Sequence, residues 1–191
     1  MVIMVTGGCG SGKSEYAENR VLACRELWKQ KIFSQLPCNE EASLHTIYVA
    51  TMYPYGGESY KKIDRHRKMR ENKQFETVEC YTHLEDLKIL APSIVLLECM
   101  SNLIANERYQ PEGRREQCAD VIRKGILHCR KQTEDLIIVT NEVSSDGIHY
   151  DSETMQYIRV LGEVNRMLAQ IADEVVEVVY GIPVFHKKAR W

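Results

Sequence analysis

The chain of 191 residues is long enough to bury one hydrophobic core, so we expect a single domain over residues 1–191. It carries 25 Lys and Arg residues against 27 Asp and Glu residues, which gives a formal net charge of −2. This near balance argues against a general affinity for nucleic acid or for an anionic membrane surface. Apolar runs stay far shorter than the ~20 residues of a transmembrane helix, so we expect no membrane span.

The seven cysteines are odd in number and scattered along the chain, without a C-x-x-C pair. This pattern favours neither a zinc site nor a disulfide framework, and it is typical of reduced thiols in a cytosolic protein. The apolar stretch at the start of the chain is too short for a signal peptide and runs directly into a glycine-rich segment. We therefore predict a cytoplasmic protein.

A glycine-rich turn follows the first apolar run, Val2–Val5, which is typical of a buried parallel strand. The turn reads G-x-x-x-x-G-K-S, the P-loop signature, and residues 14–27 after it favour a helix. Glycines let backbone N–H groups converge on phosphate, and the helix N-terminus adds partial positive charge. Lys13 is predicted to reach the β- and γ-phosphates, and the Ser14 hydroxyl to ligate Mg²⁺. The predicted triphosphate-binding residues of this loop are Gly7, Gly8, Cys9, Gly10, Ser11, Gly12, Lys13 and Ser14.

Strands and helices alternate after the loop. The elements predicted up to residue 92 are a surface insertion over 28–45, a strand over 46–51, a loop over 52–57, a helix over 58–72, a strand over 75–79 and a short helix over 82–90. Thr82 and Glu85 have the spacing of a capping box, which favours the last of these helices.

The second half of the chain continues the alternation. The predicted elements are a strand over 93–98, a helix over 100–108, a long helix over 114–133, a strand over 136–140, a helix over 152–172 and two strands over 175–180 and 182–185. Gly181 between the last two strands, with Pro183 after it, favours an antiparallel hairpin at a sheet edge. The alternation as a whole predicts an α/β sandwich around a mostly parallel sheet.

Ligands bind outside the carboxyl ends of the strands in such a sheet. The strand that begins at Ser93 has a continuously apolar core and ends in Glu98. A carboxylate at the end of a strand beside the P-loop strand can help to hold Mg²⁺, so Ser14 and Glu98 are the predicted metal ligands. The alternative is that Glu98 is only a charged residue at a strand end.

A cation-rich stretch, Lys61–Arg70, surrounds His66 with six Lys and Arg residues. One interpretation is a solvated basic helix face. The other is that the cations attract a triphosphate and disfavour the protonated imidazole, which would keep His66 neutral and nucleophilic near neutral pH. A neutral histidine can attack a phosphorus atom and form a covalent intermediate, which divides one nucleotidyl transfer into two displacements.

In their order along the chain, these motifs resemble those of the bifunctional adenosylcobinamide kinase / adenosylcobinamide-phosphate guanylyltransferase family of cobalamin biosynthesis. The resemblance covers nearly the whole chain and is most specific at His66–Arg67 and at Thr140–Val143. The other matching positions are residues 5–8, 11–14, 48–51, Ile63, Arg70, 77–79, 96–99, Gly162, Val164, Asn165, 172–175 and 181–182.

The resemblance implies a RecA-like P-loop NTPase fold, a three-layer sandwich that assembles as a homotrimer. It implies that the protein phosphorylates adenosylcobinamide, a corrinoid, with ATP or GTP. It further implies that GMP passes from GTP to that phosphate through a guanylyl group on His66, with Lys13 as the second catalytic residue. The nucleotide contacts that it implies beyond the loop are Ala50, Thr51, Met52, Arg67, Lys68, Met69, Arg70, Glu79 and Glu98.

The chain departs from the family pattern at Gly10, where the family has arginine, and over residues 149–159, where an arginine-rich helix start is replaced. Two other interpretations of the motifs remain open. One is a P-loop kinase of another small molecule in which His66 is structural, and the other is a nucleotide-binding regulatory module. A binding module does not need Lys13, Ser14, Glu98 and His66 together, which favours an enzyme.

Overall fold

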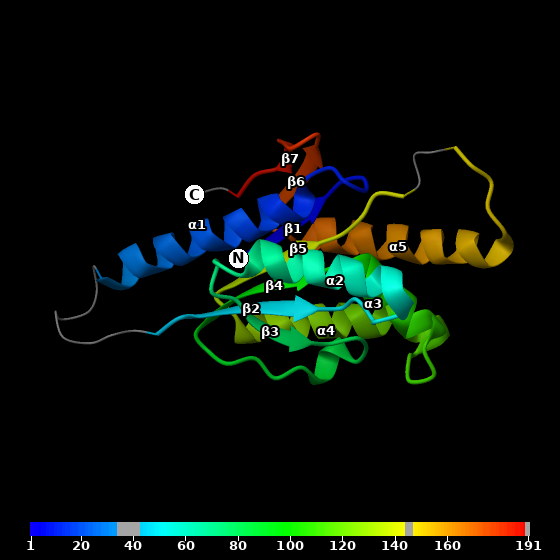
Figure 1. Ribbon diagram of the computed structural model, residues 1–191, viewed down its shortest axis with the longest axis horizontal. Coiled ribbons are helices and arrows are strands. Elements are labelled where there is room, and N and C mark those ends of the chain that lie inside the picture. Colours follow the sequence, from blue (N-terminus) through cyan, green and yellow to red (C-terminus); the bar gives the residue numbers. More distant parts are fainter. Residues whose placement is uncertain (34–42, 144–146, 190–191) are drawn as a thin grey trace.

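The computed structural model describes residues 1–33, 43–143 and 147–189 (Figure 1). Within these residues, the strands are β1 (Val2–Thr6), β2 (His45–Ala50), β3 (Glu76–Glu79), β4 (Ser93–Glu98), β5 (Asp135–Val139), β6 (Glu174–Val179) and β7 (Ile182–Lys187). The helices are α1 (Lys13–Phe33), α2 (Gly56–Arg70), α3 (Met100–Tyr109), α4 (Cys118–Gln132) and α5 (Ser152–Ile171), with the short 3-10 helices η1 (Leu84–Asp86) and η2 (Arg115–Gln117).

The strands form one sheet in the order β3-β2-β4-β5-β1-β6-β7. The first six of these strands run parallel to one another, and β7 pairs antiparallel with β6. This confirms the predicted α/β fold with a mostly parallel sheet and an antiparallel C-terminal edge. The edge position of β7 explains its sequence, because Pro183 cannot donate a ladder hydrogen bond and all six residues of the strand are exposed.

Helices cover both faces of the sheet and complete a three-layer sandwich (Figure 1). Alternate residues of β1 divide between the two cores, since successive side chains of a strand point to opposite faces. Val2 and Met4 pack with α3, α4 and α5, whereas Ile3 and Val5 pack with α1. Helix α2 lies on the same face as α1 (Figure 1).

The position of β4 differs from the prediction, because β5 lies between β1 and β4. The expectation that the strand ending in Glu98 adjoins the P-loop strand is therefore wrong. The sequence could not show whether β4 or β5 adjoins β1, since every fully buried parallel strand has the same kind of apolar sequence. Glu98 nevertheless ends at the expected edge, because the register aligns Val5, Val139, Glu98, Ala50 and Glu79 in one row across five strands.

Helix α1 continues to Phe33, so the first part of the predicted insertion over residues 28–45 is helical. The polar residues Lys29, Gln30 and Lys31 do not break the helix; they are exposed on its surface and are good helix formers. Residues 34–42 of the predicted insertion lie outside the described residues.

The helix predicted over residues 82–90 is also wrong, since only η1 forms there. Side chains of α4 provide the hydrogen bonds that a helix would have made internally. Gln132 accepts a bond from the Ile89 N–H, and both Gln132 and His128 contact the Leu87 carbonyl. The backbone can therefore run along α4 without leaving its polar groups unpaired.

The close contact between η1 and α4 predicts that one added methyl group at this contact destabilises the fold. A Cβ atom added at Gly125 would lie 2.7 Å from Cβ of Leu84, which is buried. We expect Gly125→Ala to lower the free energy of unfolding by ~1–3 kcal/mol, measured by urea denaturation. Gly162→Ala on α5 is the matched control, because its Cβ would meet nothing within 4 Å. Equal urea midpoints for the two variants would contradict this packing.

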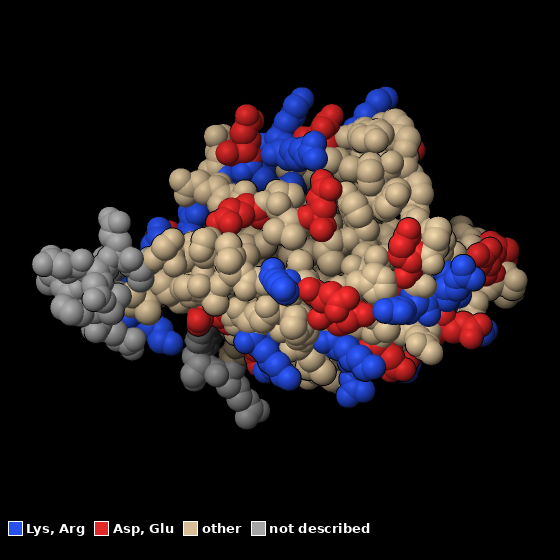
Figure 2. Space-filling view, turned by 90° about the horizontal axis from the view of Figure 1, so that it is seen from below, with Lys and Arg blue, Asp and Glu red and all other residues tan. Residues whose placement is uncertain are grey.

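Acidic and basic side chains are interspersed on the face that Figure 2 shows, as the near-neutral composition predicts. Among the helices that the structure describes, each is too short or too polar to cross a membrane. The six cysteines in the described ranges are free thiols, and Cys9 is the exposed member of the six.

Candidate functional site

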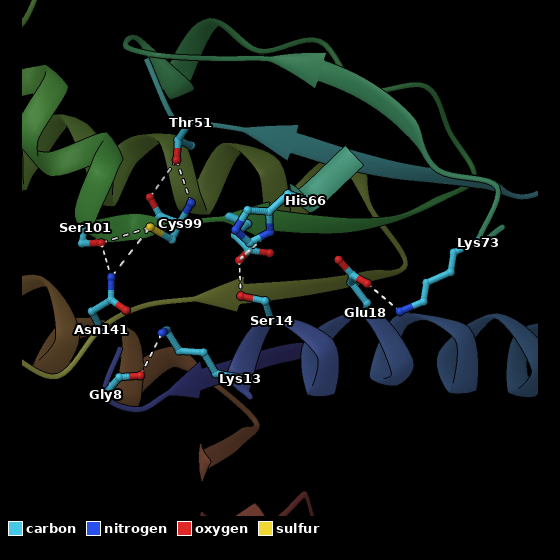
Figure 3. Close-up of polar contacts among 11 residues, drawn as sticks. Gly8, Lys13, Ser14, Glu18, Thr51, His66, Lys73, Cys99, Ser101 and Asn141 are labelled. Atoms are coloured by element: carbon cyan, nitrogen blue, oxygen red, sulfur yellow. Dashed lines mark hydrogen bonds and ion pairs between the residues drawn. The ribbon is translucent and has the colours of Figure 1, made fainter. Parts of the chain in front are cut away.

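The glycine-rich turn leaves β1 and leads into α1, which begins at Lys13. Gly7 permits the turn to pack against β6, since a Cβ atom there would lie 2.5 Å from the Val178 carbonyl oxygen. The Gly181 N–H donates to the Ser11 carbonyl oxygen at 2.8 Å and ties the turn to the C-terminal hairpin. The Lys13 ammonium donates to the Gly8 carbonyl oxygen at 3.1 Å and thus lies over the turn (Figure 3).

The first turn of α1 meets the end of β4 at a short contact. The Ser14 hydroxyl donates a hydrogen bond to Oε1 of Glu98, whose residue is 8% exposed. The second carboxylate oxygen of Glu98, Oε2, is buried without a hydrogen-bond partner among the described residues. This oxygen is therefore available to a ligand. The hydrogen bond between Ser14 and Glu98 brings the two predicted metal ligands together.

His66 on α2 projects toward this contact (Figure 3). Its Nδ1 lies 3.8 Å from Oε1 of Glu98, although the two residues are far apart in the sequence. A third group, the carboxylate of Glu18 on α1, lies so close that ligand atoms of the three residues are all within 4.8 Å of one another. The sequence predicted a purely cationic environment for His66, whereas the structure adds two carboxylates.

Glu18 is fully buried and forms an ion pair with Lys73, with 2.5 Å between its Oε2 and the Lys73 Nζ. Burial raises the pKa of Glu18, and the Lys73 ammonium acts in the opposite direction. The ion pair joins α1 to the segment that follows α2. No periodic signal in the sequence marks this pair, because in the sequence each residue resembles an ordinary surface charge of a helix or a turn.

Cationic side chains of α2 anchor that helix to the sheet. The Arg70 guanidinium stacks on the ring of Tyr48 in β2, with its Cζ 3.4 Å from the ring centroid. Arg67 lies 3.7 Å from the Glu79 carboxylate at the end of β3. Arg70 is the buried residue of α2, so polar contacts rather than an apolar stripe set the place of this helix.

A buried polar network holds the ends of β2 and β4. The Thr51 hydroxyl accepts from the Cys99 N–H at 2.7 Å and donates to the Cys99 carbonyl oxygen at 2.8 Å. The Ser101 hydroxyl contacts the Cys99 sulfur at 3.0 Å and accepts from the Asn141 amide at 2.5 Å (Figure 3). Burial raises the pKa of the Cys99 thiol, which makes it an unreactive member of the network.

A pocket of about 520 Å³ opens above these strand ends, between the glycine-rich turn and α2. Its lining includes thirteen of the predicted site residues: Cys9, Gly10, Gly12, Lys13, Ser14, Ala50, Met52, His66, Arg67, Met69, Arg70, Glu79 and Glu98. This volume is in the range of small-molecule sites in proteins.

Five predicted site residues lie outside the lining. Gly7, Gly8 and Ser11 form the base of the turn, and Thr51 is buried with its hydroxyl engaged by Cys99. Lys68 belongs to a separate surface hollow on α2, with Lys61, Asp64, Arg65 and Met69.

The pocket also includes residues that the sequence reasoning did not choose: Glu15, Tyr48, Lys62, Ile63, Arg65, Thr77, Tyr81, Cys99, Asn102 and Asn141. Asn141 follows an apolar strand, and this strand-end position was a usable signal. Tyr81 follows β3 without any motif, and only the three-dimensional structure brings it to the site.

The fold and the glycine-rich turn together define a P-loop nucleotide-binding protein whose pocket also holds a histidine. The chain belongs to the CobU family, described as "Cobinamide kinase / cobinamide phosphate guanyltransferase", whose model matches residues 3–185.

Two curated relatives are each 31% identical over 199 residues, which cover 96% of this chain and 98% of the relative. Both are described as "Bifunctional adenosylcobalamin biosynthesis protein CobU", one from Escherichia coli (strain K12) and one from Salmonella typhimurium (strain LT2).

Among solved structures, the chain is similar to one described as an ATPase domain, at 9% identity and a TM-score of 0.48 over 92% of this chain and 68% of that one. It is also similar to the flagellar accessory protein FlaH from Methanocaldococcus jannaschii, at 11% identity and a TM-score of 0.45 over 98% of this chain and 78% of that one.

Proposed function

We propose that this protein catalyses two successive transfers to a corrinoid. The first phosphorylates the hydroxyl group of adenosylcobinamide with ATP or GTP. The second transfers GMP from GTP to the new phosphate through a covalent guanylyl group on His66. The observation that carries the proposal is the contact of both His66 and Ser14 with the same carboxylate, Glu98, within one pocket.

In the phosphoryl step, Lys13 and the backbone N–H groups of the turn bind the triphosphate and neutralise charge on the transferred group. The oxygen donors of Ser14 and Glu98 suit Mg²⁺, and the unpartnered Oε2 of Glu98 supports such a ligand. Mg²⁺, when bound there, would supply positive charge to the phosphates. Ser14 and Glu98 would hold it, and Lys13 would act from the other side of the triphosphate.

In the guanylyl step, His66 attacks the α-phosphorus of GTP. A nitrogen–phosphorus bond forms, the bond to the oxygen that bridges the α- and β-phosphates breaks, and pyrophosphate leaves. Nδ1 faces Glu98, which leaves Nε2 as the attacking atom. An oxygen of the corrinoid phosphate then attacks the same phosphorus, the nitrogen–phosphorus bond breaks, and His66 returns to its initial state. Arg67 and Arg70 line the pocket and neutralise developing charge.

The homotrimer also belongs to this proposal. Ile182, Val184 and Phe185 of β7 are more than two-fifths exposed, and Tyr180 before them is 94% exposed. An exposed apolar edge strand is a surface that a second chain can cover, which supports self-association.

The test uses GTP labelled at the α-phosphate and the full chain. We expect a labelled protein adduct that is acid-labile and alkali-stable, as a phosphorus–nitrogen bond should be. Adenosylcobinamide phosphate added to the isolated adduct should take up the label as adenosylcobinamide-GDP.

Each of the other interpretations gives a different result in the same assay. A P-loop kinase with a structural His66 would transfer the γ-phosphate to its own acceptor and form no adduct. A regulatory module would bind GTP and give neither product. An unlabelled protein would therefore overturn the guanylyl-histidine mechanism.

A further inference from the structure

The carboxylate of Glu18 is fully buried, and its two oxygens differ in their contacts. Oε2 accepts a hydrogen bond from the Lys73 ammonium, whereas Oε1 has no hydrogen-bond partner among the described residues. Glu18 lies one turn after Ser14 on α1, so both side chains project from the same face of the helix. In Figure 3 the free oxygen is directed toward the ring of His66. Burial of an unpaired acceptor costs free energy, so a donor that reaches Oε1 in the working complex would be stabilising.

His66 carries the complementary unpaired group. Its Nδ1 is buried and has no hydrogen-bond partner in the part of the chain that the structure describes. The 3.8 Å between Nδ1 and Oε1 of Glu98 is too long for a hydrogen bond, and that oxygen already accepts from Ser14. Ionised carboxylates accept but do not donate, so a ring nitrogen that faces them is favoured to carry the proton. In the neutral imidazole the proton therefore belongs on Nδ1, which leaves the lone pair on Nε2.

Glu18 is better placed than Glu98 to accept this proton in a hydrogen bond. In the proposed function Glu98 and Ser14 would hold Mg²⁺, which engages the Glu98 carboxylate. Glu18 keeps Oε1 free, and its ion pair with Lys73 holds the carboxylate from the other side. Ligand atoms of Glu18 and His66 lie within 4.8 Å of each other. This limit exceeds a hydrogen bond by about 2 Å, and catalytic hydrogen bonds commonly tighten when substrate binds.

We propose that Glu18 is the positioning residue of His66 in guanylyl transfer. This inference rests on the guanylyl-histidine of the proposed function. Oε1 of Glu18 accepts the Nδ1–H of His66 and thereby directs the Nε2 lone pair toward the α-phosphorus. When the nitrogen–phosphorus bond forms at Nε2, the ring becomes a cation that keeps its proton on Nδ1, and the carboxylate stabilises this charge. No proton has to leave the ring, and departure of the guanylyl group restores the neutral imidazole.

The tautomer of His66 is the direct test, and ¹⁵N NMR of the wild-type chain measures it. All six histidines are labelled with ¹⁵N, and the His66 signals are those that are absent from His66→Ala. The spectra are recorded at about pH 8, where an ordinary imidazole is neutral. We expect Nδ1 of His66 to give the signal of a protonated ring nitrogen and Nε2 that of an unprotonated one. The opposite assignment overturns the proposal without any variant of Glu18.

Glu18→Gln keeps the shape of the side chain and reverses the contact. The Lys73 ammonium can only donate, so it takes the amide oxygen, and the amide N–H₂ group turns toward His66. This group donates to Nδ1 and moves the ring proton to Nε2, the attacking atom. We expect the rate of adduct formation from GTP to fall by about 10²-fold or more, as it does when a histidine takes the wrong tautomer in a serine protease. Phosphoryl transfer does not use the imidazole and should stay within about tenfold of wild type.

A second substitution separates this role from that of the ion pair. Lys73→Met combined with Glu18→Gln removes the donor that holds the amide oxygen, so this oxygen can turn to the Nδ1–H of His66. We expect the double variant to form the adduct at least about tenfold faster than Glu18→Gln alone. If Glu18 served only to join α1 to the segment after α2, the double variant would be no faster than the single one.

Glu26→Gln is the matched control on the same helix. Glu26 is exposed, pairs with Lys29 and lies outside the pocket, so this variant should form the adduct at the wild-type rate. The urea midpoint of each variant is measured on the same preparation.

The outcomes separate this inference from the proposed function. If wild type forms no adduct with GTP, the proposed function fails and the positioning role fails with it. If the adduct forms and Glu18→Gln matches wild type, or loses phosphoryl transfer to the same extent as adduct formation, only the positioning role is overturned. A defect of Glu18→Gln that Lys73→Met does not relieve also overturns it, because the orientation of the amide would then not matter.

Discussion

Replacing His66 with alanine is expected to abolish guanylyl transfer while phosphoryl transfer to the corrinoid hydroxyl continues. The attacking nitrogen is removed, so we expect the rate of adduct formation from GTP to fall by at least about 10³-fold. Lys13, Ser14 and Glu98 keep their places, and we expect the kinase rate to stay within about tenfold of wild type. Both rates are measured on one protein preparation, with label at the α-phosphate for the first and at the γ-phosphate for the second.

His186→Ala is the control, because His186 lies on β7 and pairs with Glu177 away from the pocket. It should leave both rates unchanged. His66 is about one-quarter exposed, so its replacement creates no large cavity and the urea midpoint should remain near that of wild type. Adduct formation that persists in His66→Ala would assign the nucleophile to another residue. Loss of both rates together would indicate that His66 serves triphosphate binding rather than covalent chemistry.

The sequence was most informative where one local signal decides the structure. The run from Ser93 to Glu98 is continuously apolar between its two polar ends, and β4 has those bounds. The glycine-rich turn has its predicted strand before it and its predicted helix after it, because few other arrangements accommodate that sequence. The C-terminal hairpin was also predictable, since Gly181 permits the turn, with its φ of 80°, and Pro183 excludes a central position for β7.

Contacts between distant segments could not be derived in this way. His66 and Glu98 meet because α2 crosses above the end of β4, and the charged contacts of α2 carry no hydrophobic period that would reveal its place. The pair of Glu18 and Lys73 could not be predicted either, because in the sequence each residue resembles an ordinary surface charge. The strand order depends on packing across the whole sheet, which explains why the sequence does not predict β5 between β1 and β4.

The site thus combines a part fixed by local sequence with a part fixed by tertiary packing. The glycine-rich turn is one continuous segment, whereas the carboxylates and the histidine come from α1, α2 and β4. A chance glycine turn would not require a part-buried serine–glutamate contact or a histidine beside it. Their convergence in one pocket supports the proposal that the turn is a triphosphate site that serves a second, covalent step.

Replacing Lys13 with methionine is expected to impair both steps, in contrast to the loss of His66. The Lys13 ammonium bonds the Gly8 carbonyl oxygen within the turn, and a bound triphosphate would offer it a stronger, charged acceptor. Methionine keeps a long flexible side chain of similar reach and removes the charge. We expect kcat/KM to fall by about 10²-fold or more for phosphoryl transfer and for adduct formation alike, since both reactions develop charge on the triphosphate.

Lys29→Met is the matched control on the same helix. Lys29 is exposed, pairs with Glu26 and lies outside the pocket, so this variant should retain both rates. Equal losses in the two steps for Lys13→Met would mean that one triphosphate position serves both reactions. A loss confined to phosphoryl transfer would instead require a second triphosphate position for guanylyl transfer, and the turn would then serve the kinase step alone.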